Sequence, residues 1–188
     1  MRDEPRLLAS LHQRLSPSRL AHSLNVADSA AALARCHGVD ELAAYFAGLA
    51  HDICKCDSVD NMTRILKNSG YTFLDCECGN AKLLHAPAGA EFLRLERLCN
   101  EADILNAMRY HTTGRAGMSL LEKVVFMADL ISAERDYPDV DIVRKLAFAD
   151  LDGALRYVLR YIISDLTGNG ETIHPNSVEC LEWLDSLP

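Results

Sequence analysis

Several features that would place this chain in a common class of protein are missing from its sequence. The first residues, Met1 to Pro5, are charged and no apolar segment follows them, so we expect no secretory signal. The apolar stretch 124–128 ends at Asp129, far short of the roughly 20 residues that cross a bilayer. The formal net charge is −8, which argues against broad nucleic-acid binding because that needs basic surface. We therefore expect a cytoplasmic protein with neither a membrane nor a nucleic acid as its partner.

The cysteines do not have the spacing of a structural zinc site. There are seven, an odd number, which without a signal peptide indicates reduced thiols. Two pairs, Cys54/Cys56 and Cys76/Cys78, are separated by a single residue, whereas structural zinc sites use C-x₂₋₄-C. We expect the cysteines to serve as small buried side chains.

What the sequence does contain is helical periodicity along almost its whole length. Ser16, Asp40 and Ser119 are typical helix N-caps, and Gly38 and Gly70 are typical stops. No strand pattern, repeat or linker is visible, so the prediction is an all-α fold with one domain over residues 1–188. The expected helices cover residues 7–15, 17–37, 40–51, 57–68, 87–96, 102–110, 119–132, 141–149, 150–165 and 176–187, with Pro87 in a first turn just after His85.

The pair His51-Asp52 follows the strongly apolar segment 42–50. A carboxylate beside so much apolar surface costs several kcal/mol of desolvation unless a partner compensates it, and a metal ion is one such partner. Four further residues have apolar neighbours, and several of them lie at expected helix ends: His22, His85, His111 and Asp129. We expect ordinary structural roles for the other three histidines, with His174 in a turn before the last helix: His12, His37 and His174.

The order H…HD…H…H…D resembles the HD-domain superfamily of metal-dependent phosphohydrolases. The narrower resemblance, over about residues 19–184, is to the YqeK family of bacterial symmetrical diadenosine tetraphosphate hydrolases, with the motif-bearing core at about 19–135. Ala50, Cys54 and the segment 131–135 depart from the usual family pattern but leave the ligand positions intact. The motifs that carry the resemblance are Ala47-Gly48-Leu49-Ala50-His51-Asp52-Ile53-Cys54-Lys55, Leu84-His85-Ala86-Pro87, His111-Thr112-Thr113-Gly114-Arg115 and Ala128-Asp129-Leu130-Ile131-Ser132-Ala133-Glu134-Arg135.

This resemblance implies an HD-domain helical bundle that hydrolyses diadenosine tetraphosphate to two ADP with a water activated by two divalent metals. Iron is the expected metal, and manganese, cobalt and zinc suit the same ligands. Asp52 is expected to bridge the two ions. The implied ligands are His22, His51, Asp52 and Asp129 for one ion and Asp52, His85 and His111 for the other.

Positions near these ligands suggest contacts with phosphate. Lys55 lies three residues after Asp52, where it can stabilise transition-state charge or simply complement a helix end. Arg19 precedes His22 by about one turn and can pair with a carboxylate or a phosphate. The expected catalytic residues are Asp52, Lys55 and Arg115, and the expected phosphate contacts are Arg19, Lys55, Thr112, Thr113, Gly114, Arg115 and Arg135.

Two alternatives stay open. One is another HD phosphohydrolase, acting on nucleoside monophosphates or cyclic nucleotides, and the His-Thr-Thr-Gly-Arg segment favours a dinucleoside polyphosphate over these. The other is a nucleotide- or metal-binding module without catalysis. Expected partners are the dinucleoside polyphosphate and ADP- or GDP-like nucleotides. The choice between adenine and guanine, and a homodimeric state, are left open.

Overall fold

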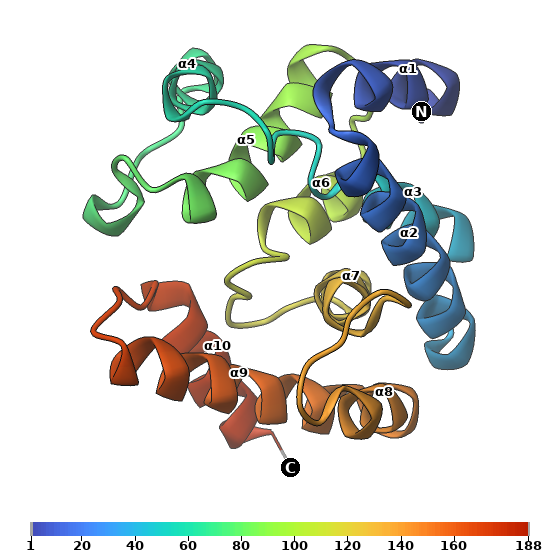
Figure 1. Ribbon diagram of the computed structural model, residues 1–188, viewed down its shortest axis with the longest axis vertical. Helices are drawn as coiled ribbons and strands as arrows, with labels where there is room; N and C mark the ends of the chain where they lie inside the picture. The colour runs from blue at the N-terminus through green and yellow to red at the C-terminus, as the bar shows by residue number, and fades with distance from the viewer. Residues whose placement is uncertain (1, 188) are drawn as a thin grey trace.

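The fold is all-α, as predicted. The computed structural model describes residues 2–187, and within that range it contains no β-strand, only an isolated bridge between Arg2 and Cys99. Figure 1 shows the helices in chain order. Those of the described chain are α1 (Glu4–Arg14), α2 (Pro17–His37), α3 (Glu41–Ala50), α4 (Val59–Ser69), α5 (Ala81–Leu95), α6 (Ala102–Arg109), α7 (Leu120–Ile131), α8 (Val140–Ala149), α9 (Leu151–Gly168) and α10 (Pro175–Ser186), with a short 3₁₀ turn η1 (Asp75–Glu77).

Side-chain caps and left-handed glycines set most helix ends where the sequence predicts them. The Ser16 side chain accepts a hydrogen bond from the Arg19 N–H, and Ser119 does the same for Glu122. Gly38 ends α2 with φ of 71°, a conformation that costs glycine little. Helix boundaries in this chain are therefore local properties of the sequence.

Helix α5 departs most from the prediction, because it begins at Ala81 rather than at Pro87. The Asn80 side chain caps it by accepting from the Lys82 N–H, which supplies a start that the prediction missed. Proline inside a helix removes one backbone hydrogen bond, but Pro87 and its neighbours are buried and packing offsets that loss. His85 consequently lies inside a helix and not before one.

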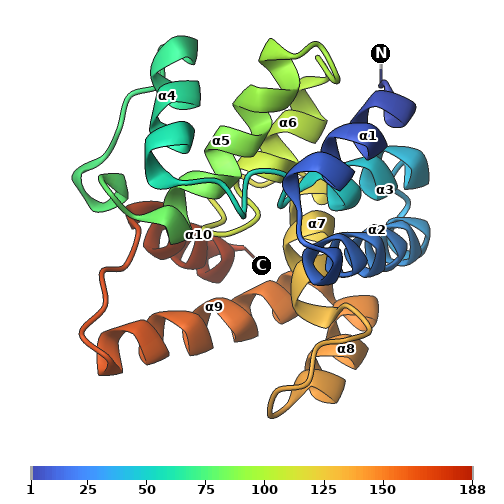
Figure 2. The ribbon, with the colours of Figure 1, turned by 45° about the horizontal axis from the view of Figure 1, so that its top comes forward.

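Helix α7 lies at the centre of the molecule and packs against α2, α3, α6, α8 and α9 (Figure 2). Its residues 121–128 are all buried, which explains why the apolar run 124–128 is not a membrane segment. One continuous hydrophobic cluster extends from Leu7 to Leu184, and the single domain over residues 1–188 stays a prediction. Across the described residues, no helix has the length and apolar content needed to cross a membrane.

Helices α2 and α3 approach each other closely at Gly48. A Cβ built on this glycine would lie 3.0 Å from the Cα of Ala27 and 3.1 Å from the carbonyl oxygen of Val26. Both are backbone atoms, so neither can rotate away. The close contact matters for function because α3 ends beside His51 and α2 carries His22.

We expect Gly48→Ala to lower the free energy of unfolding by about 1–3 kcal/mol through overpacking, measured by chemical denaturation. Gly168→Ala is the matched control, because a Cβ there would meet nothing within 4 Å. That control should leave the stability unchanged or raise it slightly. Equal stabilities for the two variants would contradict this account of the contact.

Candidate metal centre

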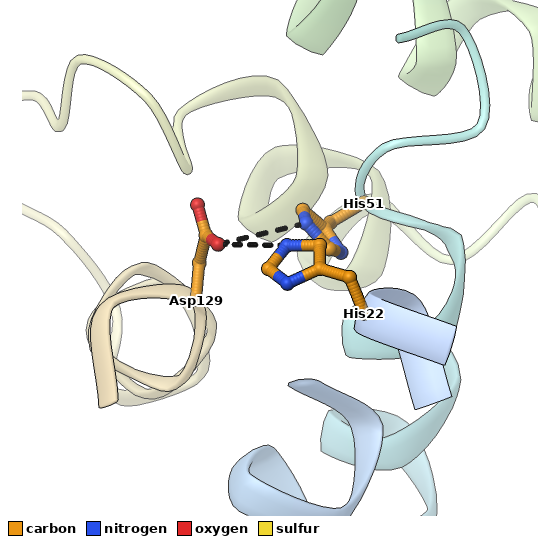
Figure 3. A group of neighbouring side chains, drawn as sticks. All are labelled: His22, His51 and Asp129. Carbon is orange, nitrogen blue, oxygen red and sulfur yellow. Dashed lines mark ion pairs between the residues drawn. The ribbon is translucent and has the colours of Figure 1, made fainter. Parts of the chain in front are cut away.

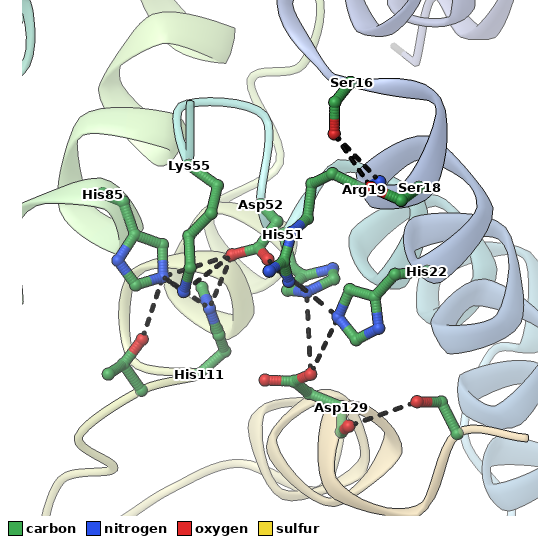
Figure 4. Close-up of polar contacts among 12 residues, drawn as sticks. Ser16, Ser18, Arg19, His22, His51, Asp52, Lys55, His85, His111 and Asp129 are labelled. Carbon is green, nitrogen blue, oxygen red and sulfur yellow. Dashed lines mark hydrogen bonds and ion pairs between the residues drawn. The ribbon is translucent and has the colours of Figure 1, made fainter. Parts of the chain in front are cut away.

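Six side chains from five separate segments converge at one point in the fold (Figure 4). Helix α2 supplies one, the turn after α3 two, α5 one, the end of α6 one and α7 one. Five of the six are buried, and Asp129 is partly exposed. The structure thus brings together all six predicted ligands: His22, His51, Asp52, His85, His111 and Asp129.

The two oxygens of the Asp52 carboxylate face different histidines. Oδ2 lies 3.5 Å from Nε2 of His51 and 4.0 Å from Nε2 of His22. Oδ1 lies 3.2 Å from Nε2 of His85 and 3.6 Å from Nε2 of His111. With only 1% of its surface exposed, Asp52 is enclosed between two histidine pairs.

Asp129 adds a second carboxylate on the side of His22 and His51 (Figure 3). Its Oδ1 lies 3.0 Å from Nε2 of His22 and 3.9 Å from Nε2 of His51. One potential ligand atom from each of these three residues lies within 4.8 Å of the others, and the same holds for His51, Asp52 and His111. The cluster therefore contains two groups of potential ligands that share His51.

Backbone carbonyls orient three of the imidazoles. Nδ1 lies 2.6 Å from the Gly48 oxygen in His51, 2.7 Å from the Met108 oxygen in His111 and 3.3 Å from the Ala81 oxygen in His85. A carbonyl only accepts hydrogen bonds, so each Nδ1 carries the proton and donates. The lone pair of each Nε2 then points into the cluster, which is the tautomer that a metal ligand requires.

His22 is oriented instead by the carboxylate of Glu134, a residue that was not predicted from the sequence. Nδ1 of His22 donates to Glu134, which also accepts from Ser132 Oγ at 2.8 Å and from Asn25 Nδ2 at 2.6 Å. Glu134 belongs to the segment 131–135, which departs from the family pattern. That departure is the only feature of the sequence that points to Glu134. A carboxylate on the outer nitrogen of a histidine raises its basicity as a ligand.

The electrostatics of the cluster favour charged carboxylates and a neutral His85. Burial opposes ionisation of Asp52, but His51, His111 and His85 outweigh it and lower the pKa of the carboxyl group. Burial likewise opposes ionisation of Asp129, and His22, His51 and Arg135 lower its pKa. Burial lowers the pKa of His85 to about 4. Anionic oxygen and neutral imidazole are the forms that bind metal.

Buried polar atoms without partners are a second reason why these residues fit a metal ion. The Nε2 atoms of His22 and His51 and the Oδ1 atom of Asp52 are buried without a hydrogen-bond partner in the described structure. Unpartnered buried polar atoms are costly, and a bound cation satisfies them. Atoms bound to one ion at about 2.0–2.2 Å lie roughly 3–3.5 Å apart, close to the spacing of several atoms in this cluster.

Three predicted phosphate contacts lie against the carboxylates. Nζ of Lys55 lies 3.0 Å from Nε2 of His85 and 3.5 Å from Oδ1 of Asp52. Nη1 of Arg19 lies 3.0 Å from Oδ2 of Asp52. Arg135 pairs with the carboxylate of Asp129 and donates from Nε to its backbone oxygen at 2.7 Å. All three side chains are partly exposed, so each has access to a ligand.

Only the first part of the His-Thr-Thr-Gly-Arg segment reaches the cluster. Thr112 Oγ1 lies 3.3 Å from Nε2 of His85. Thr113 is buried, and its hydroxyl donates to the oxygen of Gly114 at 2.9 Å. Gly114 has φ of 67°, and a Cβ on it would lie 3.0 Å from Sγ of Cys180, so the close neighbour here is α10. Arg115 is held by Glu122 on α7, with Nε and Nη2 donating at 2.8 and 2.6 Å.

The cysteines take no part in the cluster. All seven are free thiols, and none belongs to a group that could hold a metal within residues 2–187. The expectation that they are buried is right for Cys54, Cys99 and Cys180, whereas Cys76 is only partly buried. It is wrong for Cys36, Cys56 and Cys78, which are exposed because they lie on outward-facing or turn positions. Burial raises the pKa of Cys54 to about 12, which keeps this thiol protonated.

Comparison with known proteins identifies the family to which this geometry belongs. Residues 19–134 match the model of the HD domain, and the chain belongs to the HD-domain family, whose members are metal-dependent. The predicted membership is thereby confirmed.

Individual relatives resemble the chain over nearly its full length. A protein of Bacillus subtilis named symmetrical bis(5'-nucleosyl)-tetraphosphatase is 37% identical over 181 residues, covering 95% of this chain and 96% of the relative. A Staphylococcus aureus protein of the same name is 31% identical, covering 92% and 90%. A crystal structure from Clostridium acetobutylicum, described as a predicted HD superfamily hydrolase involved in NAD metabolism, superposes with a TM-score of 0.95 at 35% identity and covers 99% of this chain and 98% of its own.

We expect Glu134→Ala to weaken metal binding about 10- to 100-fold, because His22 loses the acceptor that fixes its ring. Competition with a coloured chelator measures this change without any assay of activity. Glu179→Ala is a matched control, since Glu179 is an exposed glutamate on α10. Unchanged affinity in Glu134→Ala would show that Glu134 does not orient a ligand.

Proposed function

We propose that the protein is a metal-dependent symmetrical bis(5'-nucleosyl)-tetraphosphatase that hydrolyses diadenosine tetraphosphate to two molecules of ADP. The observation that carries the proposal is the Asp52 carboxylate, whose two oxygens face two different histidine pairs. Relatives that share this name over nearly the whole chain support it.

The cluster has the donors for two divalent ions. In this proposal one ion would be held by His22, His51, Asp52 and Asp129. The other would be held by Asp52, His85 and His111. Iron is our proposed metal, and manganese, cobalt and zinc accept the same nitrogen and oxygen ligands.

Two such ions would supply a water of lowered pKa and would neutralise the phosphates that repel a nucleophile. The residues of the chain supply the rest. Asp52 sets the spacing of the centre, and the carbonyls beneath the histidines keep each Nε2 directed inward. Lys55, Arg19 and Arg135 would exchange carboxylate partners for phosphate oxygens and so stabilise the added charge of the transition state.

The residues after His111 differ in how close they lie to the metal cluster, and we propose different roles for them accordingly. In this proposal the Thr112 hydroxyl, 3.3 Å from Nε2 of His85, donates to a phosphate. Thr113, Gly114 and Arg115 have close contacts with one another, with α7 and with α10, and we propose that they hold the loop after His111 in shape. A direct role of Arg115 in phosphate binding would require it to leave Glu122.

The alternatives differ in what they require of the cluster. A module without catalysis does not need a complete set of metal ligands, whereas here each of the six ligand positions carries a histidine or an aspartate. Another HD phosphohydrolase would use the same centre on a nucleoside monophosphate or a cyclic nucleotide. We propose that the enzyme is cytoplasmic. Its oligomeric state is a separate question, and light scattering of the purified protein decides whether it is a homodimer.

Replacing the shared carboxylate should affect both ions. We expect Asp52→Asn to bind neither ion tightly and to lose at least roughly 100-fold in turnover, because each ion loses an anionic ligand. His85→Ala should retain one ion, and Asp60→Asn, at an exposed carboxylate on α4, should retain both. Elemental analysis of protein purified without chelators measures the stoichiometry. Two ions per chain in Asp52→Asn would refute the bridging role.

The substrate is tested by product analysis on the metal-loaded protein. We expect diadenosine tetraphosphate to give ADP as the single nucleotide product, and removal of metal by chelation to abolish the reaction. Formation of AMP with ATP would mean asymmetric cleavage. Release of phosphate from a nucleoside monophosphate, with the dinucleotide untouched, would favour the other class of HD phosphohydrolase.

A further inference from the structure

A small aromatic cavity lies where α7, α8 and α9 meet, a region visible in Figures 1 and 2. Its volume is about 160 Å³. Three tyrosines, Tyr137, Tyr157 and Tyr161, contribute to its walls, and aliphatic side chains such as Leu130 and Ile162 complete them. An apolar cavity of about 150 Å³ holds a benzene-sized ring, so this space has the size and the surface for a flat aromatic group.

The cavity and a groove beside the metal cluster share one wall residue. Tyr137 lines both the cavity and a groove of about 400 Å³ that is also lined by Arg19, His22 and Arg135. The carboxylates of Glu134 and Asp136 also line this groove, which shares Tyr137 with the aromatic cavity.

Two local features distinguish this cavity from an ordinary gap in the packing. The hydroxyl of Tyr137 is buried without a hydrogen-bond partner in the described part of the chain. Asp139 on the cavity wall has φ of 69°, an unusual conformation for a residue other than glycine, and its Oδ2 accepts a hydrogen bond from Tyr157 Oη at 3.1 Å. Unpaired polar atoms and left-handed residues of this kind gather at ligand sites.

We propose that this cavity binds the purine base of one nucleoside of the substrate while its phosphates lie at the metal cluster and against Arg19 and Arg135 in the neighbouring groove. The inference rests on the proposed function. The metal cluster, the groove with Arg19 and Arg135, and the aromatic cavity follow the order of groups in a nucleotide, from phosphates to base. Bases stack on tyrosine rings with little dependence on their identity, and Asp139 offers a carboxylate to an amino group of the base.

Tyr161 is the residue on which to test this site, because its side chain is 65% exposed and its removal should not disturb the core. Binding of ADP and of pyrophosphate to the metal-loaded protein is compared by calorimetry, since pyrophosphate has the two phosphates without the nucleoside. We expect Tyr161→Ala to weaken ADP binding about 5- to 100-fold and to change pyrophosphate binding less than about twofold. Tyr161→Phe keeps the ring and should bind ADP as the wild type does.

Phe148→Ala is the matched control, because Phe148 is an exposed aromatic residue of α8 that is absent from the cavity wall. It should bind both ligands normally. Equal effects of Tyr161→Ala on ADP and pyrophosphate, or no effect on either, would overturn the proposal. So would a change from dimer to monomer in Tyr161→Ala with ADP binding intact, which would make this face a subunit interface.

Hydrolysis by the wild type and ADP binding by Tyr161→Ala, measured together, test the base site separately from the proposed function on which it rests. If the wild type fails to hydrolyse diadenosine tetraphosphate while Tyr161→Ala still loses ADP selectively, the proposed substrate is wrong and the base site stands. If hydrolysis is observed and ADP binding does not depend on Tyr161, the base site is wrong and the function stands.

Discussion

The Asp52 carboxylate is the interaction on which the rest of the site depends. It is nearly inaccessible to water, and an ionised carboxylate in that position is costly unless cations or donors surround it. The surroundings supply them on both sides, with His22 and His51 facing one oxygen and His85 and His111 facing the other. Nothing else in the cluster contacts both histidine pairs in this way.

The fold holds this carboxylate in place through rigid elements. Helix α3 ends at Ala50, so His51 and Asp52 follow a helix that packs closely on α2 at Gly48. Helix α7 carries Asp129 through the centre of the molecule and is packed on most sides. Because each imidazole is oriented by a carbonyl or by Glu134, the ligand atoms are directed inward before any ion binds. Two divalent ions held by two carboxylates would leave a local positive surplus, through which a chain of net charge −8 would attract a polyanion at one place.

The sequence predicted the helices and the six converging residues because both leave local signals. Ser16, Gly38, Asp40 and Ser119 mark helix ends by their own hydrogen bonds or dihedral angles. The start of α5 was missed because Pro87 is a stronger signal than Asn80, although burial lets the helix continue through it. The expected ligands were found from their order along the chain and a family resemblance, and their distances come only from the tertiary structure.

Contacts between distant segments were not predictable in this way. Glu134 contacts His22 across 112 positions, and no local pattern announces that pairing. Arg115 looked like a phosphate ligand in sequence, but its nearest acceptor is Glu122, seven residues later and one helix further on. The aromatic cavity combines residues from α7, α8, α9 and the segment 137–139, and its tyrosines have no common motif.

The central claim is that one carboxylate joins two metal ions, and a crystal structure with anomalous diffraction data collected at the metal edge tests it most directly. We expect two anomalous peaks per chain, one on the Oδ2 side of Asp52 near His22, His51 and Asp129, and one on the Oδ1 side near His85 and His111. A single peak, or two peaks of which only one lies within bonding distance of Asp52, would contradict the account.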